Sequence, residues 1–385
     1  MSKKIRILFT GGGTGGHIYP LVAVAVEAQA LAAGKGIDLE IRYLGAYGPY
    51  RGLLERNGMR VGGIIGSKLR RYFSLANLIE APKMLIGMAQ ALVKVGLFRP
   101  QAVFSKGGPG ALPVVWAAKF YRIPILVHES DAVPGMTSLW TGRYAQEVAV
   151  SFESAAKYFP GKTLLTGNPI RKYLLAEEPE IKTQEGFKKF FGFDPQLPLL
   201  LFLGGSQGAV RLNNFVLQNL QALLPKYQIL HQTGVANYDR VVREFSGFAE
   251  TAEGAPLKNR YQPVPYFNDD IRLAMRAADL VVSRSGAGSV FEIAAFGKPS
   301  VLIPLPEAAQ NHQLANAREY AASGAALVLE EKDLNIESFA ATADSGLANE
   351  QKKAALSEAA LKFSKPDAAK QIAAEIYKLA GTPVS

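Results

Sequence analysis

Two glycine-rich segments each directly follow an apolar run and carry side chains suited to phosphate or acid–base chemistry. Residues 9–17 have the sequence Phe-Thr-Gly-Gly-Gly-Thr-Gly-Gly-His and end in His17, and residues 202–209, Phe-Leu-Gly-Gly-Ser-Gln-Gly-Ala, contain Ser206. A glycine turn between a strand and a helix lets backbone N–H groups approach a phosphate at the positive end of the helix dipole. Because the two segments lie almost half a chain apart, they predict two nucleotide-binding-type domains that face one cleft.

His17 stands directly after the first glycine loop. An imidazole titrates near neutral pH and can take a proton from an attacking hydroxyl group. A histidine at a helix start that binds substrate or caps the turn is the equally weighted alternative. For the loop glycines, we favour close approach of the backbone to a substrate over a purely structural tight turn.

Further polar side chains follow later strands. The Ser206 loop offers successive N–H groups and a hydroxyl to a diphosphate, and the Arg171 guanidinium could neutralise a diphosphate leaving group. Glu292 is expected about one turn into a helix, where a carboxylate can accept both hydroxyls of a ribose. Gln313 and Asn316 are three residues apart and share a helix face that could bind sugar hydroxyls. The alternatives are a helix cap for Ser206, a first-turn acid for Glu292 and polar surface positions for the others.

Several chemistries are disfavoured by what accompanies the first loop. Its spacing fits a dinucleotide fingerprint, which also expects an acidic residue at the end of the second strand. That strand ends in Tyr-Leu-Gly-Ala at residues 43–46, and Asp38 and Glu40 lie at its start. No Walker Lys-Ser/Thr follows, there is no cysteine, and we find no Asp-x-Asp pair at a strand end or His/Glu cluster with zinc spacing. We therefore expect no metal site and no cofactor.

Composition points to two domains and an anionic partner. The 385 residues include 48% hydrophobic and 20% charged residues, enough for two cores, and no run of ~20 uninterrupted apolar residues occurs. The formal net charge is +10. Residues 64–98 combine basic and apolar side chains, which predicts contact with an anionic membrane surface, although packing against a sheet would explain many of the apolar ones. Nucleic acid is disfavoured because no helix-turn-helix, RNA-recognition or stacked aromatic–basic motif accompanies the charge.

Strands and helices alternate in both halves of the chain, which predicts doubly wound parallel sheets. Expected strands lie at 5–9, 39–44, 102–105, 124–128, 199–203, 227–232, 280–283 and 301–304. Expected helices include 19–33, a helix ending near residue 121, and 212–224. Residues 354–379 predict two helices interrupted near Pro366, and the last one could cross back to the first domain.

Together these motifs closely resemble the MurG family, the UDP-N-acetylglucosamine:undecaprenyl-pyrophosphoryl-MurNAc-pentapeptide N-acetylglucosamine transferases of bacterial peptidoglycan synthesis. The resemblance covers nearly the whole chain and rests on residues 12–17, 106–108, 128–131, 167–171, 204–209 and 284–292, with Gln313 and Asn316. It implies an α/β GT-B fold, two Rossmann-like doubly wound domains with an interdomain cleft. Residues 1–167 would form the acceptor- and membrane-binding domain, 168–364 the UDP-GlcNAc-binding domain, and 365–385 a C-terminal helix.

The resemblance also implies roles for individual residues. Ser206 and Arg171 would contact the diphosphate, Glu292 the ribose, Asn268 the uracil and Gln313 the GlcNAc hydroxyls. Other residues would line the nucleotide or face the phosphates: Ala287, Gly288, Ser289, Val290 and Phe291 for the nucleotide, and Thr14, Gly15 and Gly16 for the donor and acceptor phosphates. Our own hypothesis for the reaction is that His17, or a water that it positions, takes the proton of the attacking hydroxyl.

Two segments depart from the family pattern. Residues 128–131 are His-Glu-Ser-Asp where many members have His-Glu-Gln-Asn, so Asp131 places a carboxylate where an amide is usual. A carboxylate can still accept a hydrogen bond from a sugar hydroxyl, but it repels phosphate. The loop after Lys106 also lacks the aromatic residue that usually follows its glycines. Acceptor contacts are therefore less well specified by the sequence than donor contacts.

The implied activity is inverting transfer of GlcNAc from UDP-GlcNAc to the C4 hydroxyl of lipid I, which gives lipid II. The implied location is peripheral, on the cytoplasmic face of the bacterial plasma membrane, with cell-wall synthesis or division proteins as partners. The alternatives are another UDP-sugar GT-B enzyme (a glycolipid glycosyltransferase or an epimerase), a nicotinamide-dependent oxidoreductase, and a non-catalytic nucleotide-sugar sensor.

Overall fold

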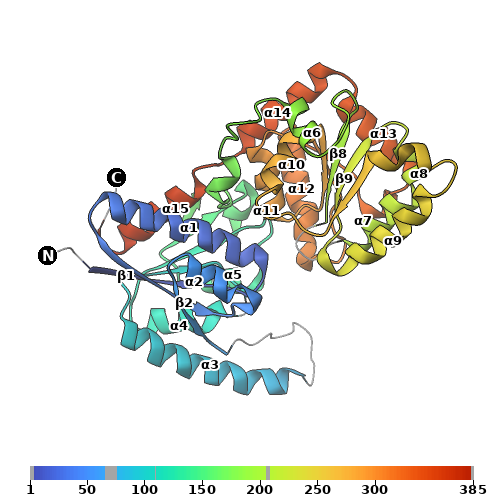
Figure 1. The fold of residues 1–385 in the computed structure, drawn as a ribbon. Helices are drawn as coiled ribbons and strands as arrows, with labels where there is room; N and C mark the ends of the chain where they lie inside the picture. Colours follow the sequence, from blue (N-terminus) through green and yellow to red (C-terminus); the bar gives the residue numbers. More distant parts are fainter. Residues whose placement is uncertain (1–3, 66–75, 109, 205–208, 383–385) are drawn as a thin grey trace. The chain divides into compact units, whose positions relative to one another are not determined.

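The structure is a computed structural model that describes residues 4–65, 76–108, 110–204 and 209–382. It divides into two compact units (Figure 1): Met1–Arg171 together with Lys365–Ser385, and Lys172–Ser364. The predicted division fell after residue 167, so Asn168, Pro169, Ile170 and Arg171 belong with the first unit.

The first unit is built on a seven-stranded parallel sheet of order β3-β2-β1-β4-β5-β6-β7. Its strands are β1 (Lys4–Thr10), β2 (Asp38–Gly45), β3 (Arg60–Gly63), β4 (Ala102–Ser105), β5 (Ile125–Glu129), β6 (Glu147–Val150) and β7 (Thr163–Leu165). Strand order reverses between β1 and β4, whose last residues Thr10 and Ser105 are paired. In an open sheet of this kind ligands bind outside the carboxyl ends of the strands at such a switch point.

The helices of the first unit are α1 (Gly15–Gly34), α2 (Arg51–Arg56), α3 (Ala76–Phe98), α4 (Ala111–Phe120), α5 (Met136–Gly142) and the C-terminal α15 (Ala368–Leu379). Helix α1 begins at Gly15, directly after the glycine loop, rather than at the predicted residue 19. By length and composition α1 could cross a membrane, the one such helix in the described ranges, but 56% of its apolar window is buried inside the protein. It is therefore accounted for as a core helix.

Helix α15 packs on α1 in the first unit (Figure 1). Ile372, Ile376 and Tyr377 belong to the same apolar core as α1. The Tyr377 hydroxyl donates a hydrogen bond of 2.8 Å to the Ala28 carbonyl of α1. The last helix of the chain thus returns to the N-terminal sheet, which the sequence had left open.

The second unit has a six-stranded parallel sheet of order β10-β9-β8-β11-β12-β13. Its strands are β8 (Leu199–Leu203), β9 (Gln228–Gln232), β10 (Tyr261–Val264), β11 (Leu280–Ser283), β12 (Ser300–Leu302) and β13 (Leu327–Val328). Its helices are α6 (Gln184–Phe190), α7 (Val210–Gln218), α8 (Leu220–Leu223), α9 (Tyr238–Ala249), α10 (Ile271–Ala277), α11 (Ala287–Ala295), α12 (His312–Ala322), α13 (Ile336–Leu347) and α14 (Glu350–Phe363). The two sheets place β1 and β8 at equivalent central positions, so the prediction of two Rossmann-like doubly wound domains is confirmed.

One predicted helix is wrong in its continuity. Residues 212–224 form two short helices, α7 and α8, that are separated at Asn219. The Asn219 amide donates to the Phe215 carbonyl at 2.7 Å, so the side chain satisfies a backbone acceptor at the helix end.

A buried histidine ties β9 to its neighbours in the second unit. Asn213 of α7 donates through Nδ2 to the Thr233 carbonyl, so its Oδ1 accepts from His231 Nε2 at 3.0 Å. The other ring nitrogen, Nδ1, then accepts from the Tyr261 hydroxyl at 2.9 Å. Burial lowers the pKa of His231 to about 3, so this ring is neutral in the folded protein.

Candidate functional site

The glycine loop after β1 packs tightly on the loop after β4. The Lys106 N–H donates to the Thr10 carbonyl at 2.9 Å, which joins the two strand ends. A Cβ added at Gly108, whose φ is +85°, would lie 2.7 Å from Gly12 Cα, and one added at Gly13 would lie 3.0 Å from Gly48 N. Close packing of the backbone therefore accounts for these glycines. The sequence analysis instead favoured close approach of the backbone to a substrate over a structural turn. Gly16 differs, since an added Cβ there would meet nothing within 4 Å.

His17 lies in the first turn of α1, held on one side by the residue that precedes the helix. The Thr14 hydroxyl and His17 Nδ1 are 2.7 Å apart. An added Cβ at Gly108 would come within 3.3 Å of Nε2, so the ring rests beside that backbone. Burial lowers the pKa of His17 to about 4, the Lys106 ammonium lowers it further and Asp131 opposes both. The imidazole is consequently neutral at pH 7, and one ring nitrogen carries a lone pair.

The predicted phosphate-facing residues of this loop surround the start of α1. Thr14 is the N-cap residue, but its side chain makes no capping hydrogen bond to the helix and pairs with His17 instead. Thr14 and Gly16 are exposed, whereas Gly15 is buried next to Tyr19 and Tyr50. An anion at this position would meet the N–H groups of the first turn and the positive helix terminus.

A cluster of buried charged groups lies behind the loop, at the ends of β4 and β5. The Lys106 side chain is 3% exposed and its Nζ donates to the Ser130 hydroxyl. Glu129 is 4% exposed and accepts two backbone N–H groups, from Asp131 at 2.9 Å and from Gly135 at 3.2 Å. Burial lowers the pKa of Lys106 and raises that of Glu129, while each charge favours the ionised form of the other. Asp131, predicted to bind substrate, is partly exposed at the edge of this cluster.

His128, in the same strand, has a structural role. It is fully buried, and its Nε2 lies 3.1 Å from the Gly167 carbonyl and 3.3 Å from the Ser151 hydroxyl. Burial, with a smaller effect from Lys106, lowers its pKa well below the usual value. The ring thus holds the chain before Arg171 against the end of β5.

Arg171 lies in the first unit. Its guanidinium carbon stands 4.5 Å from the centre of the Tyr19 ring of α1, a cation–π contact. Arg171, the residue predicted to bind the diphosphate, therefore lies beside the N-terminal turns of α1. Sequence analysis missed Tyr19, which gave no signal beyond an aromatic residue in a helix.

In the second unit, the junction between β11 and α11 is open to a ligand at its backbone. The N-cap residue Gly286 provides no side-chain cap, and a Cβ added at Gly286 or at Gly288 would meet nothing within 4 Å. The N–H groups of Ala287, Gly288 and Ser289 stand at the positive end of α11. This geometry suits a phosphate approached by backbone alone.

The side chains of two predicted nucleotide-lining residues are turned into the core of the second unit. Val290 is 0% and Phe291 is 2% exposed, and the Phe291 ring packs on Phe363 with centroids 5.3 Å apart. These two residues can therefore contact a nucleotide only through their backbone atoms. Glu292 is partly exposed and lies beyond the first turn of α11, a turn that contains no acidic residue. The alternative that Glu292 is a first-turn acid favoured by the helix dipole is therefore wrong.

The two amides on α12 hold the loop between β11 and α11. Gln313 Oε1 accepts from the Leu305 N–H at 3.0 Å, and the Gln313 carbonyl accepts from the Ser285 hydroxyl at 2.8 Å. Asn316 is fully buried and donates to the Ser285 carbonyl at 3.1 Å. Both interpretations of Asn316, a sugar ligand and a polar surface residue, are wrong, because its side chain faces the protein interior. The partly exposed Gln313 supports the same loop and stays a candidate.

The remaining predicted donor residues differ in how they are placed. Asn268 is exposed and follows Phe267, whose N–H donates to Gln232 Oε1 at 3.1 Å at the end of β9. Ser206 lies outside the described residues. Arg284 begins the 284–292 motif, and no separate role was predicted for it. It is buried, forms an ion pair with Glu331 and donates to the Ile303 carbonyl at 3.1 Å. It fixes the start of the β11–α11 loop.

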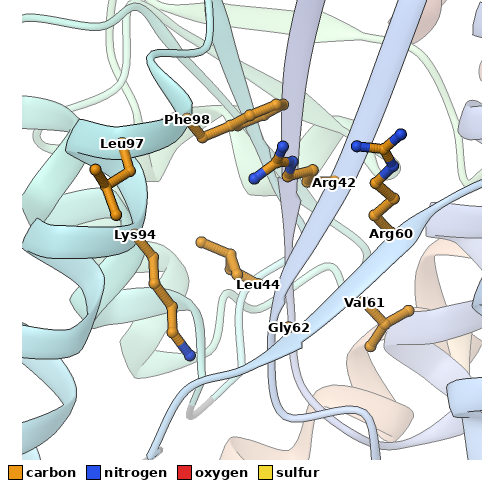
Figure 2. Close-up of a pocket in the computed structure, with 8 residues that line it drawn as sticks. All are labelled: Arg42, Leu44, Arg60, Val61, Gly62, Lys94, Leu97 and Phe98. Atoms are coloured by element: carbon orange, nitrogen blue, oxygen red, sulfur yellow. The ribbon is translucent and has the colours of Figure 1, made fainter.

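A separate pocket of about 430 Å³ lies between β2, β3 and the last turns of α3 (Figure 2). Its apolar lining residues are Leu44, Val61, Leu97 and Phe98, and its basic lining residues are Arg42, Arg60 and Lys94. The Arg42 guanidinium stands 4.2 Å from the centre of the Phe98 ring. Arg42 and Arg60 share Glu40 as an ion-pair partner, at 2.9 and 3.1 Å, and Lys94 donates to the Gly63 carbonyl at 2.7 Å. Positive charge is in excess at this edge of the sheet.

Within the described ranges there is no group of three or more His, Asp or Glu side chains arranged to hold a metal ion. The Thr14–His17 pair, the buried Lys106–Glu129 cluster and the open end of α11 are instead the places in the two units suited to proton transfer and anion binding.

Known proteins match the chain over both units. The glycosyltransferase family 28 N-terminal domain matches residues 7–150 and the corresponding C-terminal domain matches residues 199–372. A UDP-N-acetylglucosamine–N-acetylmuramyl-(pentapeptide) pyrophosphoryl-undecaprenol N-acetylglucosamine transferase of Clostridium botulinum is 37% identical over 86% of this chain and 87% of its own. The chain belongs to this transferase family, the MurG family.

Solved structures agree with that assignment. The crystal structure of Acinetobacter baumannii MurG covers 97% of this chain and 99% of its own with a TM-score of 0.74 and 26% identity. A UDP-GlcNAc 2-epimerase of Neisseria meningitidis, solved with UDP-GlcNAc, aligns over 97% of this chain and 100% of its own with a TM-score of 0.65. Because its identity is 14%, that likeness shows the fold alone. The GT-B fold is confirmed, and the oxidoreductase alternative is not supported.

Proposed function

We propose that the protein transfers GlcNAc from UDP-GlcNAc to the C4 hydroxyl of undecaprenyl-pyrophosphoryl-MurNAc-pentapeptide, with inversion at the anomeric carbon. The observation that supports this most strongly is that both units match one transferase family, while His17 stands neutral and paired with Thr14 in the first turn of α1. The product is lipid II of peptidoglycan synthesis, and UDP leaves.

His17 is the base of the proposed reaction. The acceptor hydroxyl oxygen forms a bond to the anomeric carbon as the bond from that carbon to the UDP diphosphate breaks, and the hydroxyl proton passes to His17. For Nε2 to accept it, Nδ1 must carry the other proton and donate it to the Thr14 hydroxyl, 2.7 Å away. A low pKa in the free protein keeps the base deprotonated, and the anionic substrates would raise that pKa toward the working pH.

Negative charge builds on the departing diphosphate and has to be stabilised. In the second unit, the N–H groups of Ala287, Gly288 and Ser289 at the start of α11 supply fixed dipoles, and Glu292 is assigned to the ribose. In the first unit, Arg171 and the N–H groups of Gly15 and Gly16 supply further positive potential. A preorganised donor of this kind contributes about 3 kcal/mol to transition-state stabilisation. Ser206, Asn268 and Gln313 remain proposed contacts of the diphosphate, the uracil and the GlcNAc.

The proposed membrane contact is the surface of α3 and α4, two helices that pack side by side (Figure 1). Large apolar side chains are exposed there: Leu85, Ile86, Val93 and Leu97 on α3, and Trp116 and Phe120 on α4. Lys83, Lys94 and Lys119 accompany them, and the basic pocket of Figure 2 lies at one end of α3. Each basic residue near an anionic bilayer contributes about 1 kcal/mol. Such a surface fits a peripheral enzyme with a lipid-linked acceptor; Lys68, Arg70 and Arg71 of the predicted segment lie outside the described residues.

The deciding experiment measures UDP release from UDP-GlcNAc with and without a lipid I analogue in detergent. We expect release that depends on the acceptor, and a loss of at least tenfold in kcat for His17→Ala with unchanged UDP-GlcNAc affinity. UDP binding without acceptor-dependent release would instead favour a different acceptor or a nucleotide-sugar sensor. Conversion of UDP-GlcNAc to another UDP-sugar without any lipid would favour an epimerase.

A further inference from the structure

Lys106 is a buried cation whose surroundings tie it to the predicted acceptor side of the first unit. It directly follows β4 and precedes Gly107 and Gly108, both with positive φ, so the chain turns sharply while its side chain is directed inward. Only 3% of the residue is exposed, and Nζ donates to the Ser130 hydroxyl. A lysine at a strand end is usually solvated, because burying an ammonium without a partner is costly.

The charges of two carboxylates, Glu129 and Asp131, oppose the effect of burial on the pKa of Lys106, and the two side chains differ in exposure. Glu129 is buried and held by the N–H groups of Asp131 and Gly135, so its position is fixed. Asp131 is partly exposed, and its own backbone belongs to that fixed turn. The buried carboxylate is therefore structural, whereas the carboxylate of Asp131 is the one that can meet a ligand.

His17 shares this electrostatic environment from the opposite loop. Lys106 lowers the pKa of His17, and Asp131 raises it. The base of the proposed reaction thus senses the cation and the carboxylate in opposite directions. Removal of either charge alone would leave the other acting on the imidazole without compensation.

We propose that Lys106 is a positioning residue for the acceptor: its ammonium offsets the charge of Asp131, so that this carboxylate binds an acceptor hydroxyl without repelling the acceptor's phosphates. The inference rests on the proposed function, because it assigns the acceptor to the first unit. It adds a residue and a charge balance that the transfer reaction itself does not require. It also makes Lys106 and Asp131 a pair whose substitutions are not additive.

A double-mutant cycle in the transferase assay tests the pair. Lys106→Met removes the charge and keeps most of the side-chain volume, and we expect the acceptor KM to rise at least tenfold with UDP-GlcNAc KM unchanged. Asp131→Asn alone should raise the acceptor KM only a few-fold, through the weaker hydroxyl contact. The double variant should have a lower acceptor KM than Lys106→Met, because the uncompensated carboxylate is gone. Lys35→Met, the same change at an exposed position, is the matched control and should behave as wild type.

NMR titration of His17 gives a readout that does not depend on turnover. The pKa of His17 should rise in Lys106→Met and fall in Asp131→Asn, with Lys35→Met unchanged. Additive KM effects in a wild-type protein that is active, or an unmoved His17 pKa in both single variants, would overturn the inference. If Lys106→Met does not fold, Asp131→Asn alone still decides through the direction of the His17 shift. A wild-type protein that shows no acceptor-dependent UDP release would refute the proposed function, and the titration would then test the charge pair by itself.

Discussion

Gly108 packs against the glycine loop of the first unit and lies beside His17, the proposed base. The variant Gly108→Ala therefore tests whether this packing positions His17. The φ of +85° at Gly108 is a left-handed conformation, and replacing glycine by alanine there lowers the free energy of unfolding by about 1 kcal/mol. The added methyl would also stand 2.7 Å from both the Cα and the N of Gly12. Both of these are backbone atoms, which cannot rotate away, and overpacking of this kind costs about 1–3 kcal/mol. We therefore expect a loss of about 3 kcal/mol in the free energy of unfolding.

Relief of that clash has to move the two loops apart, and His17 moves with them. An added Cβ at Gly108 would lie 3.3 Å from His17 Nε2, so the ring cannot keep its place unchanged. A displacement of about 1 Å in a reacting group can cost roughly a hundredfold in rate. Acceptor-dependent UDP release should fall by about that factor, while UDP-GlcNAc binding, assigned to the second unit, stays within twofold.

Gly36→Ala is the matched control. Its φ is +62°, but an added Cβ would meet nothing within 4 Å. Alanine at this position is therefore destabilising only through its backbone conformation and not through a clash. Chemical denaturation should show a loss of about 1 kcal/mol for Gly36→Ala and normal turnover. Equal stability and equal activity of the two variants would refute the argument that close packing of Gly12 and Gly108 positions His17.

Three further outcomes follow from other contacts. Thr14→Val removes the partner of His17 Nδ1, and steady-state kinetics should show kcat about tenfold lower. The native pKa of His231, about 3, lies below its unfolded value of about 6.5, so the unfolded state binds more protons and stability is lost as the pH falls from 6.5 toward 3. At pH 5 this histidine alone should cost about 2 kcal/mol, and the difference in unfolding free energy between pH 7 and pH 5 should be smaller by that amount in His231→Gln. Gly288→Ala should raise the melting temperature slightly, because alanine favours a helix, yet weaken UDP binding measured by calorimetry at least tenfold.

The sequence predicted most of the sheet framework because each central strand is a compact apolar run. The bounds of β4, β8 and β11 match the expected strands to the residue. All four edge strands, β3, β7, β10 and β13, were missed, and so was β6 beside β7. Strand β3 is Arg-Val-Gly-Gly and β13 spans only Leu327–Val328. Edge strands are short and less buried, so they carry little periodic signal.

The candidate site was predicted in its loops and missed in its long-range contacts. The glycine loops and His17 follow from strand–turn–helix patterns that are local in sequence. The approach of Gly108 to Gly12 and the burial of Lys106 join segments far apart in the chain, so no local pattern encodes them. The same limit explains Asn316, because an amide that supports a loop from the inside has the same spacing as one that faces a ligand.

The glycines that follow β1, β4 and β11 differ in whether folding or binding accounts for them. Gly108 is required by its own chain, because a Cβ there would lie 2.7 Å from the Gly12 backbone. Gly12 and Gly13 are tightly packed, since an added Cβ would lie 3.1 Å from His17 Nδ1 at Gly12 and 3.0 Å from Gly48 N at Gly13. Gly16 and Gly288 are not, since each lies in a helix with open space where a Cβ would stand, and alanine would stabilise that helix. A glycine at the exposed terminus of a helix, where no neighbour excludes a Cβ, leaves the backbone N–H groups open to an external group. Phosphate is the group that such a terminus attracts, so we propose Gly16 and Gly288 as the glycines of these junctions that a phosphate approaches.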